Sequence, residues 1–552
     1  MNEPRPISLS QEFPASSGME MFAELVQIIG HSTKTSEKLH ALVQYFQTAP
    51  GHDKIWVIAL FSGRRPKRSV NSKLLREWCC ECCAIPEWLF EESYHTVGDL
   101  AETIALLLPP PSRQEINHSL HHYLSCLTEI ASLDAEGKKA FILAAWEELS
   151  QPGRFVFNKL ITGGFRIGLS QQLMVQALAK VNGLETSKVA HLITGQWDPL
   201  TISYEDLFNE TLHQKDHSKP YPFYLAYTIE DSIHQLGEPT EWQAEWKWDG
   251  IRGQLIKRND QLFVWSRGEE LMTEKFPEYH ELMELLPNGT VLDGEIMPYK
   301  SGSPLPFSVL QTRIGRKQVT RKQLQEAPVA FFAYDLLEWE GNDWRDLDLA
   351  QRRNKLETLV GAMASDRLRL SPVVPFDTWE ELITIRQGSR DMGAEGLMLK
   401  RKSSGYLSGR KKGDWWKWKI DPLTIDAVMV YAQKGHGRRS NLYTDYTFAV
   451  RDGDRLVTFT KAYSGLTDKE ILEVDAFVKK HAIEKFGPVR TVQPELVFEI
   501  AFEGIAASNR HKSGVALRFP RINRWRKDKP VSEINTLDDL LSLLNQFEKK
   551  GA

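Results

Sequence analysis

Residues 245–252 read Glu-Trp-Lys-Trp-Asp-Gly-Ile-Arg, and this stretch decides how the rest of the chain is interpreted. A strand-like run carries Lys247, and the Asp249-Gly250 pair behind it is typical of a turn. Taken alone, these residues favour a surface hairpin with a solvated lysine, because a lysine two positions before Asp-Gly is a weak signal. The downstream sequence changes that interpretation.

Two later segments contain carboxylate residues within strand patterns that are otherwise apolar. Residues 291–296 read V-L-D-G-E-I, which places Asp293 and Glu295 on one face of a strand and apolar residues on the other. Two neighbouring carboxylates repel each other, so this face requires a cation or hydrogen-bond donors. Residues 393–400, G-A-E-G-L-M-L-K, place Glu395 at the start of a second apolar strand.

Three further segments complete an ordered series. Residues 329–337 form a strand pattern with Phe332 and Tyr334 on one face. Residues 414–420, D-W-W-K-W-K-I, alternate strictly, so that Lys417 and Lys419 share one face and two tryptophans share the other. A basic run, L-R-F-P-R-I-N-R-W-R-K-D-K, occupies residues 517–529.

Length and composition limit the classes of protein that fit. A chain of 552 residues corresponds to three or four domains at ~150 residues each. The net charge of −4 means that any nucleic-acid surface must be a local patch. No apolar run reaches the ~20 residues of a membrane span, and residues 1–18 lack an apolar signal core. These features predict a cytoplasmic protein that contacts no membrane.

The chain divides by pattern into three domains behind a flexible tail of residues 1–18. Residues 19–217 repeat apolar positions at helical spacing and predict an all-α domain. Residues 218–420 open with a linker-like run at 219–222. Beyond it helices alternate with strands, and Asn259-Asp260 signals a hairpin, which predicts an α+β domain. Residues 421–552 hold about five short strands and a final helix, so we expect an all-β OB-fold domain.

In chain order, these segments resemble motifs I, III, IIIa, IV, V and VI of the covalent nucleotidyltransferases, and they are most similar to those of ATP-dependent DNA ligases. Residues 265–269, W-S-R-G-E, resemble a further ligase motif. Residues 158–169, N-K-L-I-T-G-G-F-R-I-G-L, resemble the ligase DNA-binding domain. The resemblance covers nearly the whole chain from Met19 and is closest to bacterial three-domain ligases. It implies a helical DNA-binding domain, an ATP-grasp-like adenylation domain and an OB-fold domain.

The resemblance implies an enzyme that seals 5′-phosphate/3′-hydroxyl nicks in duplex DNA through a lysyl-AMP and a DNA-adenylate. Lys247 would attack ATP as a neutral amine, although a free lysine has a pKa of about 10.4. Burial and nearby cations, among them Mg²⁺, Lys417 and Lys419, would lower that pKa. The sequence has no G-x-x-x-x-G-K-[ST] motif, which excludes a P-loop enzyme.

The same resemblance assigns the remaining contacts to nucleotide and metal. Glu245 would read adenine, and Tyr334 would stack on its face. Glu295 and Glu395 would bind Mg²⁺, with Mn²⁺ as an alternative. Three side chains would hold the ribose or the phosphates, namely Arg252, Arg267 and Glu295. The residues grouped as catalytic are Lys247, Asp249, Lys417 and Lys419.

Two basic regions complete the implied nucleotide site. Just before the motif V strand we favour Arg410 over Lys411 and Lys412 as the nucleotide contact. Motif VI would meet the leaving pyrophosphate after the OB-fold domain closes about a hinge near residues 419–423. Its expected contacts are Arg518, Arg521, Arg526 and Lys529.

The expected DNA contacts lie in the helical domain. A basic loop follows Ser62-Gly63, and in a chain of negative net charge it indicates phosphate contact rather than a solvated turn. It comprises Arg64, Arg65, Lys67 and Arg68. Lys159 and Arg166 would form a second backbone-binding surface.

One cluster of cysteines and one of histidines have the spacing of metal ligands, but we interpret neither as a metal site. Cys79, Cys80, Cys82 and Cys83 would point in different directions from one helix, so we interpret them as small helix residues. His118, His121 and His122 have helical spacing without an evident acidic partner, so a solvated helix face is favoured.

Other functions remain to be weighed against a DNA ligase. An RNA ligase or a GTP-using capping enzyme shares the lysine chemistry, but the ~200-residue helical region before Lys247 argues against both. A nick-binding protein without catalysis is disfavoured by the intact lysines and glutamates. We expect a monomer that acts on nicked duplex DNA, with DNA repair as its pathway.

Overall fold

The computed structural model describes residues 18–549 except 33, 65, 67, 114–117, 163–168, 196, 210–216, 317–318, 364, 436–438, 440, 487 and 510. The chain forms two compact units. One holds residues up to 186, 198–207 and 422–547, and the other holds residues 187–197, 208–421 and 548–552. The tail expected at residues 1–18 lies, apart from Gly18, outside the described residues. Within the described ranges, no helix is long and apolar enough to cross a membrane.

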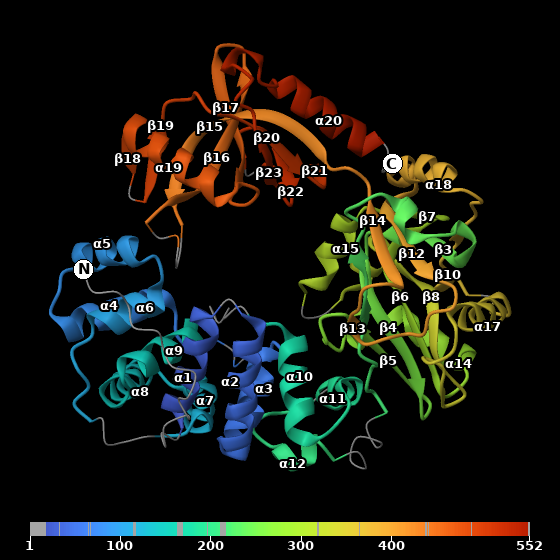
Figure 1. Cartoon of the computed structure of the whole chain (residues 1–552), viewed down its shortest axis with the longest axis horizontal. Helices are drawn as coiled ribbons and strands as arrows, with labels where there is room; N and C mark the ends of the chain where they lie inside the picture. Colours follow the sequence, from blue (N-terminus) through green and yellow to red (C-terminus); the bar gives the residue numbers. More distant parts are fainter. Residues whose placement is uncertain are drawn as a thin grey trace. The chain divides into compact units, whose positions relative to one another are not determined.

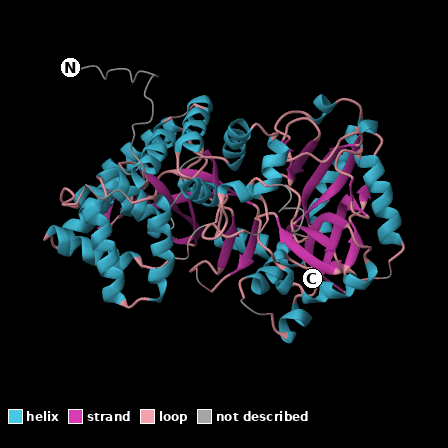
Figure 2. Ribbon diagram, turned by 90° about the horizontal axis from the view of Figure 1, so that it is seen from below, coloured by secondary structure: helices cyan, strands magenta, loops and turns pink. Residues whose placement is uncertain are grey.

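In the part of the chain up to residue 207 that the structure describes, the regular elements are all helices, which confirms the all-α prediction (Figure 1). Figure 2 distinguishes helices from strands by colour. Ser, Asp and Asn side chains cap several of these helices, for example Asn71 before α4 and Ser170 before α10. The proline run at 109–111 lies between α6 and α7. The main helices are α1 (Met19–His31), α2 (Thr35–Thr48), α3 (Gly51–Phe61), α4 (Ser72–Cys83), α5 (Glu87–Val97), α6 (Leu100–Leu107), α7 (Leu120–Glu129), α8 (Ala135–Glu148), α9 (Gln151–Thr162) and α10 (Gln171–Asn182).

The central domain is α+β, as expected, and contains two main sheets. The first has the order β10 (Leu368–Leu370), β8 (Val329–Trp339), β6 (Thr290–Lys300), β4 (Ile251–Arg258), β5 (Gln261–Ser266). The second has the order β11 (Val373–Val374), β3 (Trp242–Trp248), β12 (Ala394–Arg401), β14 (Trp415–Lys419), β2 (Tyr227–Thr228). Helix α17 (Leu349–Gly361) packs on the first sheet and α18 (Trp379–Gln387) on the second.

The predicted hairpin is present between β4 and β5. Asn259 and Asp260 form its two-residue turn with φ angles of 48° and 54°. Positive φ at both central residues is the geometry of a type I′ turn, whose twist matches that of the flanking strands. This hairpin fixes the register of β4, the strand that carries Arg252.

The linker-like run at 219–222 is buried against the central domain. Lys219 and Tyr221 are 2% and 8% exposed. The Gln254 side chain receives a hydrogen bond from the Tyr221 amide and donates one to its carbonyl, both at 2.8 Å. The Lys219 amine donates to the Leu192 carbonyl of α11 (Thr186–Ile193) at 3.0 Å. The segment thus differs from an exposed linker because its polar groups are bonded to α11 before it and to β4 after it.

The C-terminal part is the expected all-β domain. The long strand β15 (Leu423–Lys434) pairs with β16 (Tyr443–Asp452) on one side, and with β20 (Val497–Phe502) and β19 (Val489–Val492) on the other. Apolar side chains of these strands share a core with α19 (Asp468–His481) and α20 (Leu537–Lys549). The remaining strands are β17 (Arg455–Ala462), β18 (Ala482–Phe486), β21 (Gly504–Ala507), β22 (Val515–Arg518) and β23 (Arg521–Trp525).

One buried ion pair ties α17 to the first central sheet, and its loss should destabilise the domain. Arg352 Nε lies 2.7 Å from Asp335 Oδ1, and both side chains are fully buried. Arg352→Met should lower the free energy of unfolding by about 3–5 kcal/mol, because it leaves a buried carboxylate unpaired. Urea denaturation measures the change.

Lys322→Ala is the matched control, because the Lys322–Glu326 pair is solvent-exposed and lies in the same domain. It should change the free energy of unfolding by less than about 1 kcal/mol. Equal effects of the two substitutions would contradict the assignment of stability to the buried pair.

Candidate active site

The candidate nucleophile lies at the centre of a cluster of charges. Lys247 is the penultimate residue of β3, and its Nζ lies 2.6 Å from Glu395 Oε2 on the neighbouring strand β12. Lys419, on β14, reaches the same carboxylate oxygen at 3.4 Å. Because β3, β12 and β14 are adjacent in one sheet, their registers determine which side chains meet here.

Glycines allow the strands to approach closely around this cluster. A Cβ at Gly250 would lie 2.6 Å from the Ile296 carbonyl oxygen and 2.7 Å from Glu295 Cγ. A side chain at this position would therefore displace the strand that carries Glu295. Gly396 has φ +141°, where a side chain is strained, and a Cβ there would lie 2.3 Å from the Trp418 carbonyl.

The carboxyl of Glu295 has a strongly raised pKa. Burial raises the pKa of its carboxyl to about 8, and the positive charges of Lys247, Arg252 and Arg267 limit that rise. A carboxyl with this pKa holds its proton at neutral pH. Additional positive charge placed beside it would favour the ionised form.

Lys417 lies on the same face of β14 as Lys419. Burial lowers the pKa of its ammonium, and the neighbouring charges of Arg410 and Lys247 lower it further. Trp416 and Trp418, which alternate with these lysines, pack on the opposite face against the apolar cluster that includes α18. The strict alternation expected for this strand therefore separates a cationic face from an apolar one.

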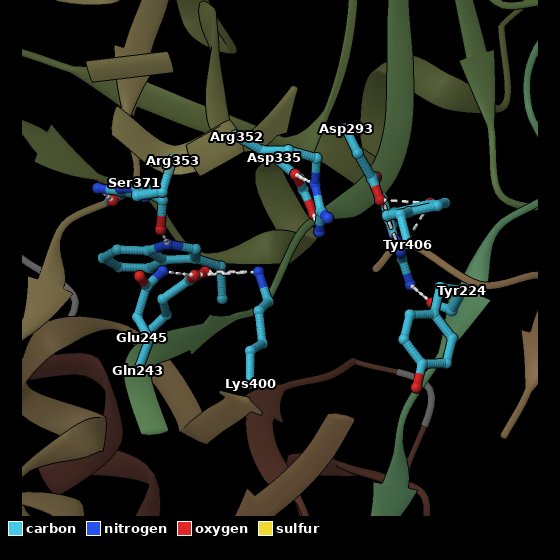
Figure 3. A network of polar contacts seen from close by, with 12 residues as sticks. Tyr224, Gln243, Glu245, Asp293, Asp335, Arg352, Arg353, Ser371, Lys400 and Tyr406 are labelled. Carbon is cyan, nitrogen blue, oxygen red and sulfur yellow. Dashed lines mark hydrogen bonds and ion pairs between the residues drawn. The ribbon is translucent and has the colours of Figure 1, made fainter. Parts of the chain in front are cut away.

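The expected adenine-reading residue is held in a buried network (Figure 3). Glu245 forms an ion pair with Lys400, whose Nζ lies 3.0 and 2.9 Å from the two carboxylate oxygens. Gln243 Nε2 donates to Glu245 Oε1 at 2.7 Å. The Lys400 amine stands 4.2 Å from the ring centre of Tyr334, the residue expected to stack on the base.

Arg252 supplies the cation that the carboxylate face of β6 requires. Its guanidinium contacts Asp293 through both Nη2–Oδ2 (2.6 Å) and Nε–Oδ1 (3.2 Å). The Tyr406 hydroxyl donates to Asp293 Oδ2 at 2.7 Å, and the Tyr224 carbonyl accepts from Arg252 Nη1 at 2.7 Å (Figure 3). The arginine is thereby fixed beside the ring of Tyr334, 5.8 Å from its centre.

Other predicted site residues lie at the edge of this cluster. Asp249 is half-buried in the turn between β3 and β4, and Arg267 is exposed just after β5. Arg410 is exposed on the short strand β13 (Gly409–Arg410), where its charge acts on Lys417. Lys411 and Lys412 are also exposed.

The motif VI residues are engaged in ion pairs within the C-terminal domain. Arg526 Nη1 and Lys529 Nζ both contact Asp426 Oδ2, at 2.9 and 2.8 Å. Arg521 contacts Glu503 at 3.1 Å. Arg518 ends β22. To reach a phosphate, Arg526 and Lys529 would have to exchange the Asp426 carboxylate for it.

The predicted DNA contacts are described in part. Arg65, Lys67 and Arg166 lie outside the described residues. Arg64 follows the C-terminus of α3, and exposed Arg68 donates from Nε to the Val70 carbonyl at 3.2 Å. Lys159 on α9 forms an ion pair with Asp99, so a DNA phosphate would compete with a carboxylate there.

The two metal-like clusters have protein partners. Trp56 donates to His121 Nδ1 at 3.0 Å, and His118 stacks on His122 and lies 3.9 Å from Glu148. This packing differs from the solvated face expected for the histidines. The α4 cysteines are free thiols, with 3.9 Å between the sulfurs of Cys79 and Cys83. Among the described residues, no group of three or more His, Cys, Asp or Glu side chains could hold a metal ion.

Sequence reasoning did not single out Gln243, Lys400 or Tyr406. Strict alternation from Glu395 places Lys400 on the opposite face of β12. The register shift between Ala394 and Leu397 reverses that parity, so both side chains lie on the same face of the sheet as Lys247 and Glu245. The glycine at 396 was the available signal, because an isolated glycine in a strand often marks a bulge.

The central domain thus gathers a strand lysine, carboxylates and basic residues, with an aromatic ring beside the buried carboxylate of Glu245. Three family models match this chain in order. Residues 19–179 match "DNA ligase N terminus", residues 224–419 match "ATP dependent DNA ligase domain", and residues 439–529 match "ATP dependent DNA ligase C terminal region".

Relatives match over nearly the whole length. A "Probable DNA ligase" of Koribacter versatilis (strain Ellin345) is 31% identical, covering 94% of this chain and 95% of its own. A "DNA ligase" of Methanoculleus marisnigri is also 31% identical, covering 94% and 97%. The solved structure named "Pmar-Lig_PreS3" has a TM-score of 0.62 at 15% identity, covering 91% of this chain and 99% of its own, which bears on the fold alone. The chain belongs to the ATP-dependent DNA ligase family.

The raised pKa of Glu295 predicts a pH dependence of stability in the protein without ligands. Between about pH 4.5 and about pH 8 the folded state retains a proton that the unfolded state has lost. The free energy of unfolding should therefore fall as pH rises through this window, by up to about 1.4 kcal/mol per pH unit.

Glu295→Gln cannot titrate and should remove this contribution. Denaturation of both proteins at a series of pH values measures the difference. Parallel stability curves for wild type and variant would show that the Glu295 carboxyl titrates normally.

Proposed function

We propose that this ligase seals 5′-phosphate/3′-hydroxyl nicks in duplex DNA through AMP bonded to Lys247. The observation that carries the proposal is the position of the Lys247 amine, 2.6 Å from Glu395 and within the charge cluster of Lys417 and Lys419. ATP is the substrate of the family. The finer assignments of residues to roles are proposals for this chain.

The first step forms a bond between Lys247 Nζ and the α-phosphorus of ATP and breaks the bond to pyrophosphate. The amine must first lose a proton, and the contact with Glu395 stabilises the protonated form. Separating that pair is therefore part of activation. Lys417 and Lys419 stabilise the phosphate charge, and Asp249 is assigned to the same catalytic group.

The base and sugar are positioned by the buried network. Glu245 faces the adenine, Tyr334 stacks on it, and Arg252, Arg267 and Glu295 hold the ribose and phosphates. Arg410 extends the cationic side of the site. The pyrophosphate contacts are assigned to motif VI, namely Arg518, Arg521, Arg526 and Lys529.

Two carboxylates of the site suit a magnesium ion. Mg²⁺ is commonly bound by one or two carboxylates together with substrate phosphates and water, and Glu295 and Glu395 provide that donor type and number. Both carboxylates interact with Lys247 and therefore lie near the expected α-phosphate. Bound magnesium, or manganese, would supply positive charge that offsets the phosphates. The residues themselves would contribute the two carboxylates.

The second step transfers AMP to the 5′-phosphate at the nick and frees Lys247. In the third, the 3′-hydroxyl attacks the activated phosphorus and AMP leaves. We further propose that the protein acts as a monomer in the cytoplasm, with DNA repair as its pathway.

Replacing the nucleophile should abolish the first step and spare the last. Lys247→Ala should lower nick sealing with ATP and magnesium by at least about 10³-fold and leave no covalent label from α-labelled ATP. The same variant should still seal a nick that already carries 5′-adenylate, because that reaction uses the DNA hydroxyl as nucleophile. Labelling of Lys247→Ala at wild-type rate would refute the proposal.

Phosphate contact by the basic loop should appear in the salt dependence of DNA binding. Neutralising Arg64, Arg65, Lys67 and Arg68 together should reduce the slope of log K against log salt by about 0.9 for each DNA phosphate that the loop neutralises in the wild type. Neutralising Lys34 and Lys73, two exposed lysines of the same helical part, tests for a general charge effect. An unchanged slope in the loop variant would place the DNA footprint elsewhere.

A further inference from the structure

The buried lysine at the end of β12 has no assigned role in ligation. We propose that Lys400 sets the base specificity of the nucleotide site by holding the Glu245 carboxylate ionised and oriented to accept a hydrogen bond. The carboxylate then receives the amino group of adenine and rejects the carbonyl oxygen of guanine. This inference rests on the proposed function, in which Glu245 faces the base.

The Lys400–Glu245 ion pair is buried and has two hydrogen bonds, unlike a surface ion pair. Lys400 and Glu245 lie on hydrogen-bonded neighbouring strands, and each side chain is only 2% exposed. The single ammonium contacts both carboxylate oxygens, at 3.0 and 2.9 Å (Figure 3). A carboxylate bridged in this way cannot rotate without breaking one of these two hydrogen bonds.

The hydrogen-bonding capacity of Glu245 is almost filled. An ionised carboxylate has about four acceptor sites. Oε1 accepts from Lys400 and from Gln243 Nε2, while Oε2 accepts from Lys400. These contacts leave about one acceptor site, on Oε2. Adenine presents a donor at N6, where guanine presents the acceptor O6, so the remaining site discriminates between them.

Lys400 also contacts the aromatic ring that is proposed to stack on the base. Its Nζ lies 4.2 Å from the ring centre of Tyr334 on β8 and 4.6 Å from that of Trp415 on β14. Cation–π attraction favours the charged amine between these rings. The Glu245 carboxylate contacts Lys400 and Gln243. On the far side of the Tyr334 ring from this pair, the nearest charge is that of Arg252, which is paired with Asp293. On β11, the residue that pairs with Glu245 in the strand register is the apolar Val373.

Removal of the lysine charge should change what Glu245 can recognise. An unpaired buried carboxylate takes up a proton rather than remain charged. A protonated carboxyl has an O–H donor, which the O6 of guanine can accept. Loss of Lys400 should therefore relax the choice between ATP and GTP, and the relaxation should depend on pH.

The experiment compares the rate of covalent labelling by α-labelled ATP and by α-labelled GTP in full-length protein with magnesium. Lys400→Met should lower the ATP-to-GTP ratio at least about tenfold at about pH 6, and the loss should be smaller at about pH 9. Lys400→Arg keeps the charge and should retain the preference for ATP. Lys257→Met removes another buried, ion-paired lysine of the same domain and should leave the ratio unchanged.

The outcomes separate this inference from the proposed function. Wild type that acquires no label on Lys247 from ATP overturns the proposed function. Normal labelling of wild type together with an unchanged nucleotide ratio in Lys400→Met, at every pH, overturns only the role of Lys400.

If Lys400→Met shows no cooperative melting, Glu245→Gln decides the question. Its amide can both donate and accept, so the ATP-to-GTP ratio should fall without dependence on pH. Retention of the wild-type ratio in Glu245→Gln would overturn the proposal.

Discussion

The contact between the Lys247 amine and the Glu395 carboxylate is the constraint on which the active site depends. Both side chains are largely buried, so each charge loses part of its hydration. The attraction between the two charges offsets that desolvation cost. The contact fixes the amine beside the carboxylate. In the proposed reaction this pair has to separate before the amine bonds to phosphorus.

The same principle recurs through the central domain. Strand carboxylates at Glu245, Asp293 and Asp335 are each matched by a cation, namely Lys400, Arg252 and Arg352. Each pair is held by further hydrogen bonds, such as those from Gln243 and Tyr406. Such networks rigidify a polar interior when every member is satisfied. The site is thus organised before substrate arrives, which suits catalysis by positioning and electrostatics.

Local patterns in the sequence predicted much of the fold. The Asn259-Asp260 turn, the strands of the carboxylate motifs and the alternation of residues 415–419 follow from short-range rules. Helix α19 was not expected, although Thr467 and Glu470 form a capping box that signals its start. The run at 219–222 was interpreted as a linker because its composition is that of a loop. Its burial depends on Gln254, more than thirty residues further along the chain.

The sequence alone determined which residues are available for the chemistry: the lysine before a tight turn, the carboxylates on strand faces, and the two lysines that alternate with tryptophans. Only the tertiary structure decided which charge meets which. Lys247 and Glu395 are 148 positions apart, and Glu245 and Lys400 are 155 positions apart. Their meeting depends on strand order and on the register shift near Gly396, which alternation within one strand does not encode. Side-chain parity is a local property, whereas register is fixed by the packing of the whole sheet.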